Sequence, residues 1–231
     1  RKNKHRNRKT ILIKHHVYMN FDSYKMPQPT FINVARDPVA LFASNFILKG
    51  KVQILKINKV NITRYSCNSC TEDRSHVPDD DKINETLEDC IKSEDPECYG
   101  GNVKQIFIEY LCGASADGCK RGKNEEDIKK LVDKIKHNIL REYYVFGVLE
   151  EMELSMKLME LMIPNYFTGL YDAYMGPVGQ TWTNNSATAF HYNISAEARE
   201  YLGRGPLSHS MDVYNFISSI FWERVKAYGL Q

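Results

Sequence analysis

Residues 31–46, FINVARDPVALFASNF, decide the fold of this chain. Thr30–Val34 alternates β-branched and apolar residues, which predicts a short buried strand. An Ala-Arg-Asp-Pro turn interrupts the alternation. The apolar spacing of Val39–Leu48 then predicts a helix, with Pro38 at its first position and Asp37 as N-cap. We therefore expect a strand, a tight turn that carries an arginine, and a helix N-terminus.

Two side chains of this stretch are suited to an anion. Ser44 follows Arg36 by eight residues, about two turns into the predicted helix and close to the same face. The guanidinium offers a bidentate fork, the hydroxyl is a donor, and the helix N-terminus is positive. The residues alone leave two interpretations open, a phosphate site or an ordinary turn with a capping aspartate.

The turn and its flanks resemble the motif that binds the 3′-phosphate of the donor in the Golgi carbohydrate sulfotransferases. Ile-Asn-Val before the turn and Arg-Asp-Pro within it are closest to the 2-O-sulfotransferases of heparan and dermatan sulfate. The resemblance implies that Arg36 and Ser44 bind the 3′-phosphate of 3′-phosphoadenosine-5′-phosphosulfate (PAPS). This family usually has a second arginine five residues after the first, whereas this chain has Leu41 there.

A second similar segment precedes the turn. Thr10–Met19 is a predicted strand with two adjacent histidines, and residues 14–21, KHHVYMNF, align without a gap to the family stretch that carries the catalytic base. The resemblance implies that His15 is the general base, a role that suits the near-neutral pKa of histidine. Neighbouring strand residues point to opposite faces, so His16 is the alternative if the register differs by one.

The longest resemblance covers residues 143–169, which are similar to a strand–helix segment of the family. Tyr143–Leu149 is a predicted buried strand and Glu150–Met162 a predicted helix. Glu150 and Glu151 are interpreted as acidic residues at the N-terminus of that helix, where the dipole favours carboxylates, and not as catalytic groups.

The other elements follow from periodicity. After a capping Asn124, an amphipathic helix is predicted from five apolar residues at helical offsets: Ile128, Leu131, Val132, Ile135 and Ile139. Further helices are expected over Thr86–Ile91, Ala196–Leu202 and Met211–Tyr228. The polar segment Tyr174–Ile194 is expected to be a surface loop. Its family counterpart is basic and near the substrate, whereas this segment has no Lys or Arg.

The expected fold class is α/β, in the form of the P-loop-like sulfotransferase fold with a central parallel sheet flanked by helices. The 5′-phosphosulfate loop of the family precedes the catalytic histidine, and residues 1–10 do not have its form. We expect a basic N-terminal arm over residues 1–9 and a partial, single sulfotransferase domain over residues 10–231. The chain is thus identified as an N-terminally truncated member of the family that lacks the phosphosulfate-loop unit.

Six cysteines in three close pairs allow two interpretations. Disulfides are typical of lumenal proteins, whereas Cys67-x-x-Cys70 has the spacing of zinc ligands, although no histidine pair has finger spacing. The resemblance implies the bridges Cys90–Cys98 and Cys112–Cys119 and leaves Cys67 and Cys70 open. The secretory pathway is also favoured by four glycosylation sequons, at Asn61, Asn84, Asn184 and Asn193.

The composition is that of a soluble domain with a sizeable core, with 42% hydrophobic residues in 231. No signal peptide or apolar run of membrane-spanning length is present, and the chain begins with Arg, so we expect a fragment. By resemblance, the whole protein is expected to be a type II membrane protein with an upstream anchor, to act in the Golgi lumen and to form a homotrimer.

The favoured function is PAPS-dependent transfer of a sulfo group to the 2-hydroxyl of uronic acid residues in heparan- or dermatan-type glycosaminoglycans. No metal is expected, because cationic side chains can stabilise the leaving phosphate. The alternative is a catalytically degenerate lumenal protein that binds sulfated glycans. Nucleic-acid binding through the basic arm, where six of the first ten residues are Lys or Arg, conflicts with the sequons and the paired cysteines.

Overall fold

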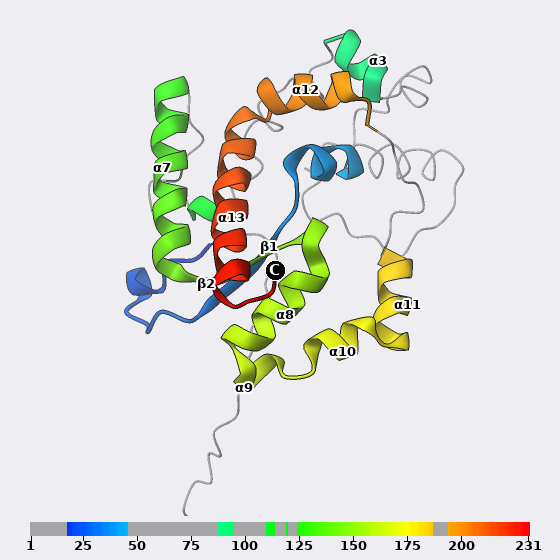
Figure 1. Cartoon of the computed structure of the whole chain (residues 1–231). Helices are drawn as coiled ribbons and strands as arrows, with labels where there is room; N and C mark the ends of the chain where they lie inside the picture. The colour runs from blue at the N-terminus through cyan, green and yellow to red at the C-terminus, as the bar shows by residue number, and fades with distance from the viewer. Residues whose placement is uncertain (1–17, 46–86, 95–109, 114–118, 120–123, 187–193) are drawn as a thin grey trace, which may run out of the picture. The chain divides into compact units, whose positions relative to one another are not determined.

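A computed structural model describes residues 18–45, 87–94, 110–113, 119, 124–186 and 194–231 (Figure 1). This part of the chain is mainly helical with a small parallel sheet, an architecture compatible with the α/β class. In chain order, its elements are η1 (Phe21–Tyr24), β1 (Phe31–Ala35), a helix over residues 38–45, α3 (Leu87–Lys92), α7 (Glu125–Glu142), β2 (Tyr143–Val148), η3 (Leu149–Glu151), α8 (Met152–Met162), α9 (Pro164–Phe167), α10 (Leu170–Met175), α11 (Pro177–Ser186), α12 (Ala196–Arg204) and α13 (Ser208–Ala227).

The chain divides into two compact units. The first, called the sheet unit here, comprises residues 1–38, 105–187 and 209–231 and contains both strands with α7 to α11 and nearly all of α13. The second unit comprises residues 39–104 and 188–208. It contains α3 and α12, which contact each other, and most of the helix over residues 38–45.

The two strands pair in parallel, from Phe31 opposite Tyr143 to Ala35 opposite Val148, with an irregularity after Phe31. The first strand was predicted from alternation and the second as a buried apolar run, and the bounds of both agree with the prediction to within one residue. The second strand is buried as predicted, whereas in β1 only Ala35 is fully buried. Parallel strands end at the same edge of a sheet, so the residues that follow Ala35 and Val148 emerge side by side.

The core of the sheet unit lies between β2, α8 and α13. Its buried residues are Val145, Val148, Leu158, Met159, Phe221 and Val225. Ser155 of α8 bonds to the strand twice: its Oγ accepts from the Val148 N–H at 2.8 Å and donates to the Val148 carbonyl at 2.9 Å. A Cβ on Gly147 would lie 2.9 Å from the Ser155 Cβ, so the close approach of α8 to β2 depends on this glycine.

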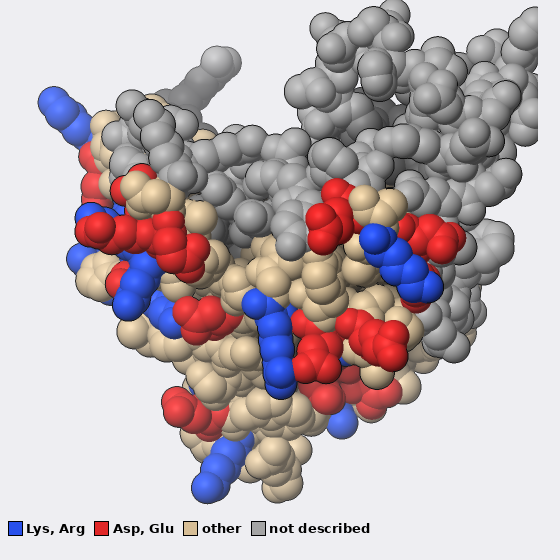
Figure 2. Space-filling view, turned by 90° about the horizontal axis from the view of Figure 1, so that it is seen from above, with Lys and Arg blue, Asp and Glu red and all other residues tan. Residues whose placement is uncertain are grey.

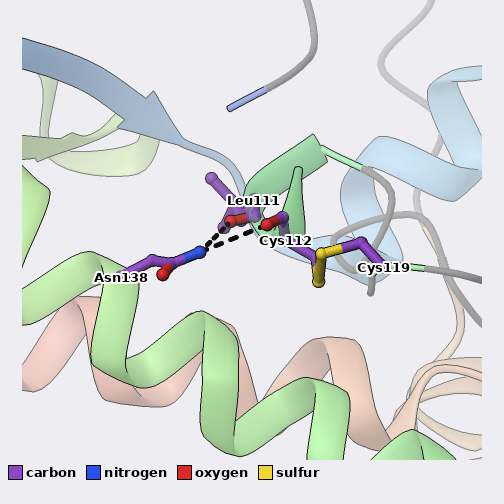
Figure 3. The surroundings of a disulfide bond; sticks show 4 residues. All are labelled: Leu111, Cys112, Cys119 and Asn138. Carbon is purple, nitrogen blue, oxygen red and sulfur yellow. Dashed lines mark hydrogen bonds between the residues drawn. A yellow bond between two sulfur atoms is a disulfide. The ribbon is translucent and has the colours of Figure 1, made fainter. Parts of the chain in front are cut away.

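Helix α7 confirms the prediction made from its apolar spacing. The Asn124 side chain caps it by accepting from the Asp127 N–H at 2.9 Å, and all five predicted apolar residues are buried. The same helix also buries Asn138, whose Nδ2 donates to the carbonyls of Leu111 (3.3 Å) and Cys112 (3.2 Å) (Figure 3).

The described cysteines are oxidised. Cys112 and Cys119, the pair that the family resemblance implies, form a disulfide with a Cα–Cα distance of 5.7 Å. Cys90 of α3 is also disulfide-bonded. Cys98, Cys67 and Cys70 lie outside the described residues.

Two expected elements were wrong in part. The segment expected to be a loop over Tyr174–Ile194 contains α11, which begins at Pro177. The helix expected to start at Glu150 starts at Met152, because Leu149–Glu151 forms a 3₁₀ turn. The helix expected over Val39–Leu48 is present through residue 45, and its last residues lie outside the described part.

Candidate functional site

The candidate site begins at the edge of the sheet where both strands end. Arg36 and Asp37 connect β1 to the helix over residues 38–45, and Glu150 lies in η3 directly after β2. Ala35 is paired with Val148, so the two connections leave the sheet as neighbours. Ligands bind characteristically at this edge in α/β proteins, since loops and helix N-termini meet there.

The carboxylate of Glu150 joins the two connections and α13. Its Oε1 accepts a hydrogen bond from the backbone N–H of Asp37 at 2.8 Å. Its Oε2 accepts from the hydroxyl of Tyr214 at 3.0 Å. Each carboxylate oxygen is thus bonded to a different segment of the sheet unit.

Tyr214 remains a donor in this arrangement. Burial is the largest cause that raises the pKa of its hydroxyl above the ordinary value, followed by the negative charge of Glu150 and the hydrogen bond to it. Asp37 and Glu151 add to the negative field. The Tyr214 phenol therefore stays protonated and bonded to Glu150 throughout the physiological pH range.

The guanidinium of Arg36, unlike the side chains of Glu150 and Tyr214, is not part of this hydrogen-bonded group. Arg36 is half-buried, and no carboxylate or carbonyl within the described part of the chain pairs with it. Arginines in such positions are usually bonded to a carboxylate, because desolvation of the charge is unfavourable without a partner. A guanidinium at this position, the end of β1, has the chemistry to bind an anion.

The other predicted site residues are placed as follows. Ser44 is half-buried on the helix over residues 38–45, in the second unit, and Leu41 is half-buried on the same helix. His15 and His16 lie outside the described residues, as do Asn61, Asn84 and Asn193. Asn184 lies near the end of α11.

Sequence reasoning missed the link between Glu150, Asp37 and Tyr214. It found Glu150 as one of two adjacent glutamates and assigned both to a helix N-terminus. Glu151 does occupy the N-cap position of α8, but without a side-chain hydrogen bond. Glu150 instead bonds across to residues 113 and 64 positions away in the sequence, a relation that no local spacing reveals.

Neither a metal-binding cluster nor a membrane-spanning helix is found among the described residues. They contain no cluster of three or more His, Cys, Asp or Glu side chains placed to hold a metal ion. Among them, none of the helices has the length and apolar character that crossing a membrane requires. On the face drawn in Figure 2, the described Lys and Arg side chains alternate with Asp and Glu and form no continuous basic surface.

Comparison with known proteins gives a consistent set of relatives. The chain is 25% identical to human uronyl 2-sulfotransferase over 221 residues, which cover 96% of this chain and 50% of that protein. It is 24% identical to the Drosophila melanogaster uronyl 2-sulfotransferase homolog pip, over 89% of this chain and 39% of that protein. Heparan sulfate 2-O-sulfotransferase 1 of Cricetulus griseus is 25% identical over 69% of this chain and 39% of its own length.

The chain therefore spans half or less of the length of each of these relatives. No model of a protein family matches the sequence.

Proposed function

We propose that this chain belongs to the family of glycosaminoglycan 2-O-sulfotransferases, and that the whole protein is a PAPS-dependent sulfotransferase. It transfers a sulfo group to the 2-hydroxyl of uronic acid residues in a heparan- or dermatan-type glycosaminoglycan. The names of the relatives support the substrate class, since they act on uronyl residues or on heparan sulfate.

The observation that carries the proposal is the state of Arg36. A half-buried guanidinium with no bonding partner in the described part of the chain, at the end of a parallel strand and before a helix, fits a phosphate. We assign Arg36 to the 3′-phosphate of PAPS. Ser44, on the helix that follows, is assigned to the same phosphate from the sequence motif.

We assign His15 as the general base that takes the proton of the acceptor hydroxyl. An imidazole with a pKa near neutrality can take this proton as the sulfo group is transferred, and cationic side chains stabilise the departing adenosine bisphosphate without a metal. The proposal includes the P-loop-like sulfotransferase fold for residues 10–231, after the basic arm over residues 1–9. It also places the protein in the Golgi lumen, anchored as a type II membrane protein, glycosylated at its sequons and homotrimeric.

Donor binding can be measured by calorimetric titration of the chain with adenosine 3′,5′-bisphosphate. We expect Arg36→Ala to weaken binding by about 10- to 100-fold, because a hydrogen bond to a charged group contributes about 1.5–3 kcal/mol. Arg141→Ala is the matched control, since it removes an equal charge from an exposed position at the end of α7. Equal affinities of the wild-type and Arg36→Ala chains would contradict the assignment.

The catalytic assignment needs a sulfo-transfer assay on the full-length protein. We expect His15→Ala to lower kcat by about 10²- to 10⁴-fold and to leave adenosine bisphosphate binding unchanged. His16→Ala serves as the matched control. If His16→Ala is the inactive variant, the register of the assignment is wrong by one residue.

The second candidate function is a catalytically degenerate lumenal protein that binds sulfated glycans. Leu41, at the position of the second arginine of the family, favours it, as does the absence of Lys and Arg between Tyr174 and Ile194. A full-length protein that binds heparin but neither binds adenosine bisphosphate nor transfers sulfo groups would establish this function.

A further inference from the structure

We propose that Glu150 is a positioning residue, which with Tyr214 fixes the backbone of Arg36 in the orientation that binds the phosphate. The inference rests on the proposed donor-binding function of Arg36. It assigns a role to two residues that the sequence motif for the phosphate does not include.

The backbone of Arg36 is anchored on both sides. The residue before it, Ala35, is held in the parallel ladder opposite Val148. The residue after it, Asp37, donates its backbone N–H to the Glu150 carboxylate at 2.8 Å. The two peptide units of Arg36 are therefore fixed by β2 and by the connection that follows β2. A guanidinium on a fixed backbone loses less conformational freedom when it binds a ligand.

Glu150 is itself attached to α13. Its other oxygen accepts from the Tyr214 hydroxyl at 3.0 Å, and Tyr214 belongs to α13, a helix with several fully buried side chains. Glu150 is exposed, but a hydrogen bond to each of its oxygens restricts the orientation of the carboxylate. Capping of α8 is a less suitable role for Glu150, because this helix begins two residues later, at Met152.

The negative charge of Glu150 allows a positioning role to be distinguished from a purely electrostatic effect. A carboxylate near a phosphate site repels the ligand, so a purely electrostatic influence of Glu150 would weaken binding. Removing that carboxylate would then strengthen the binding of adenosine bisphosphate. Positioning predicts the opposite result for a truncated side chain, and this difference in sign separates the two roles.

The experiment compares three variants by calorimetric titration with adenosine 3′,5′-bisphosphate. We expect Glu150→Ala to weaken binding about tenfold, because the acceptor for the Asp37 N–H is lost. Glu150→Gln keeps an acceptor oxygen without the charge and is expected to restore wild-type or tighter binding. Glu151→Gln, the matched control, removes the adjacent charge and should leave binding equal or tighter. Unchanged or tighter binding by Glu150→Ala would overturn the proposal.

A second measurement makes the test independent of donor binding. Hydrogen exchange of the Asp37 amide should be about tenfold faster in Glu150→Ala than in the wild type, and unchanged in Glu151→Gln. If the wild-type full-length protein does not bind adenosine bisphosphate either, the proposed function fails at this site, while the exchange rate still tests the anchoring. An Asp37 amide that exchanges equally in wild type and Glu150→Ala would refute the anchoring, whatever the binding result.

Discussion

At the scale of single residues, Asn138 shows how one polar side chain can fix the position of a segment distant in sequence. It is buried on α7, and its amide nitrogen donates to two carbonyls, those of Leu111 and Cys112. These carbonyls belong to the short segment that also carries the Cys112–Cys119 disulfide (Figure 3). A buried carbonyl without a donor is unfavourable, so this contact selects asparagine over an apolar residue of similar size.

We therefore predict that Asn138→Leu lowers the free energy of unfolding by about 1–3 kcal/mol, since it leaves two carbonyls without this donor. Asn138→Asp should lower it further, because it buries a carboxylate against carbonyl oxygens. Denaturant unfolding measures both effects. The control is His137→Ala at the exposed neighbouring position. Wild-type stability of Asn138→Leu would show that the two contacts contribute nothing net.

At the scale of elements, the packing of α8 on β2 depends on Gly147. A Cβ there would lie 2.9 Å from the Ser155 Cβ and 3.2 Å from the Met159 Cε. Met159 can move, whereas the Cβ of Ser155 is fixed by the helix backbone. The two hydrogen bonds between Ser155 and Val148 hold the helix at this distance.

Gly147→Ala is accordingly predicted to lower the free energy of unfolding by about 1–3 kcal/mol through overpacking. Chemical denaturation is the measurement. Tyr144→Thr is the control, because that side chain is half-exposed on the same strand and threonine favours strands. A Gly147→Ala protein as stable as the wild type would mean that α8 shifts without loss.

Elements with a regular apolar pattern could be predicted from the sequence. Strand β2 and α7 are examples, because their apolar residues are buried against the core. Strand β1 was also predicted, although Ala35 is the one fully buried residue of this strand. Helix α11 could not be predicted, because PVGQTWTNNS has no strong apolar face. The bond from the Thr181 hydroxyl to the Pro177 carbonyl at 2.7 Å is among its local contacts. At the site, the motif predicted the Arg36 turn, whereas the contact of Glu150 with it depends on the pairing of two distant strands.

At the scale of the whole molecule, α13 joins the end of the chain to the sheet unit. It supplies Phe221 and Val225 to the core and Tyr214 to the candidate site. The sheet unit consists of three separate stretches of sequence, and α13 lies almost entirely in the last of them.

For this helix, we predict that Phe221→Ala lowers the free energy of unfolding by about 3–5 kcal/mol, because the ring is fully buried and its loss leaves a cavity. Tyr228→Ala, an exposed aromatic residue just beyond α13, should change it by less than about 0.5 kcal/mol. Thermal and denaturant unfolding of the two variants give the comparison. Equal midpoints would show that α13 does not stabilise the sheet.

The pairing of β1 with β2 has a consequence for the time at which the molecule becomes able to bind. More than one hundred residues separate Phe31 from its partner Tyr143. Closing such a long stretch of chain is entropically unfavourable, and pairings between distant segments form slowly. The Asp37–Glu150 bond requires the same closure. Ligand recognition at Arg36 is therefore expected to arise late during refolding, after the local helices have formed.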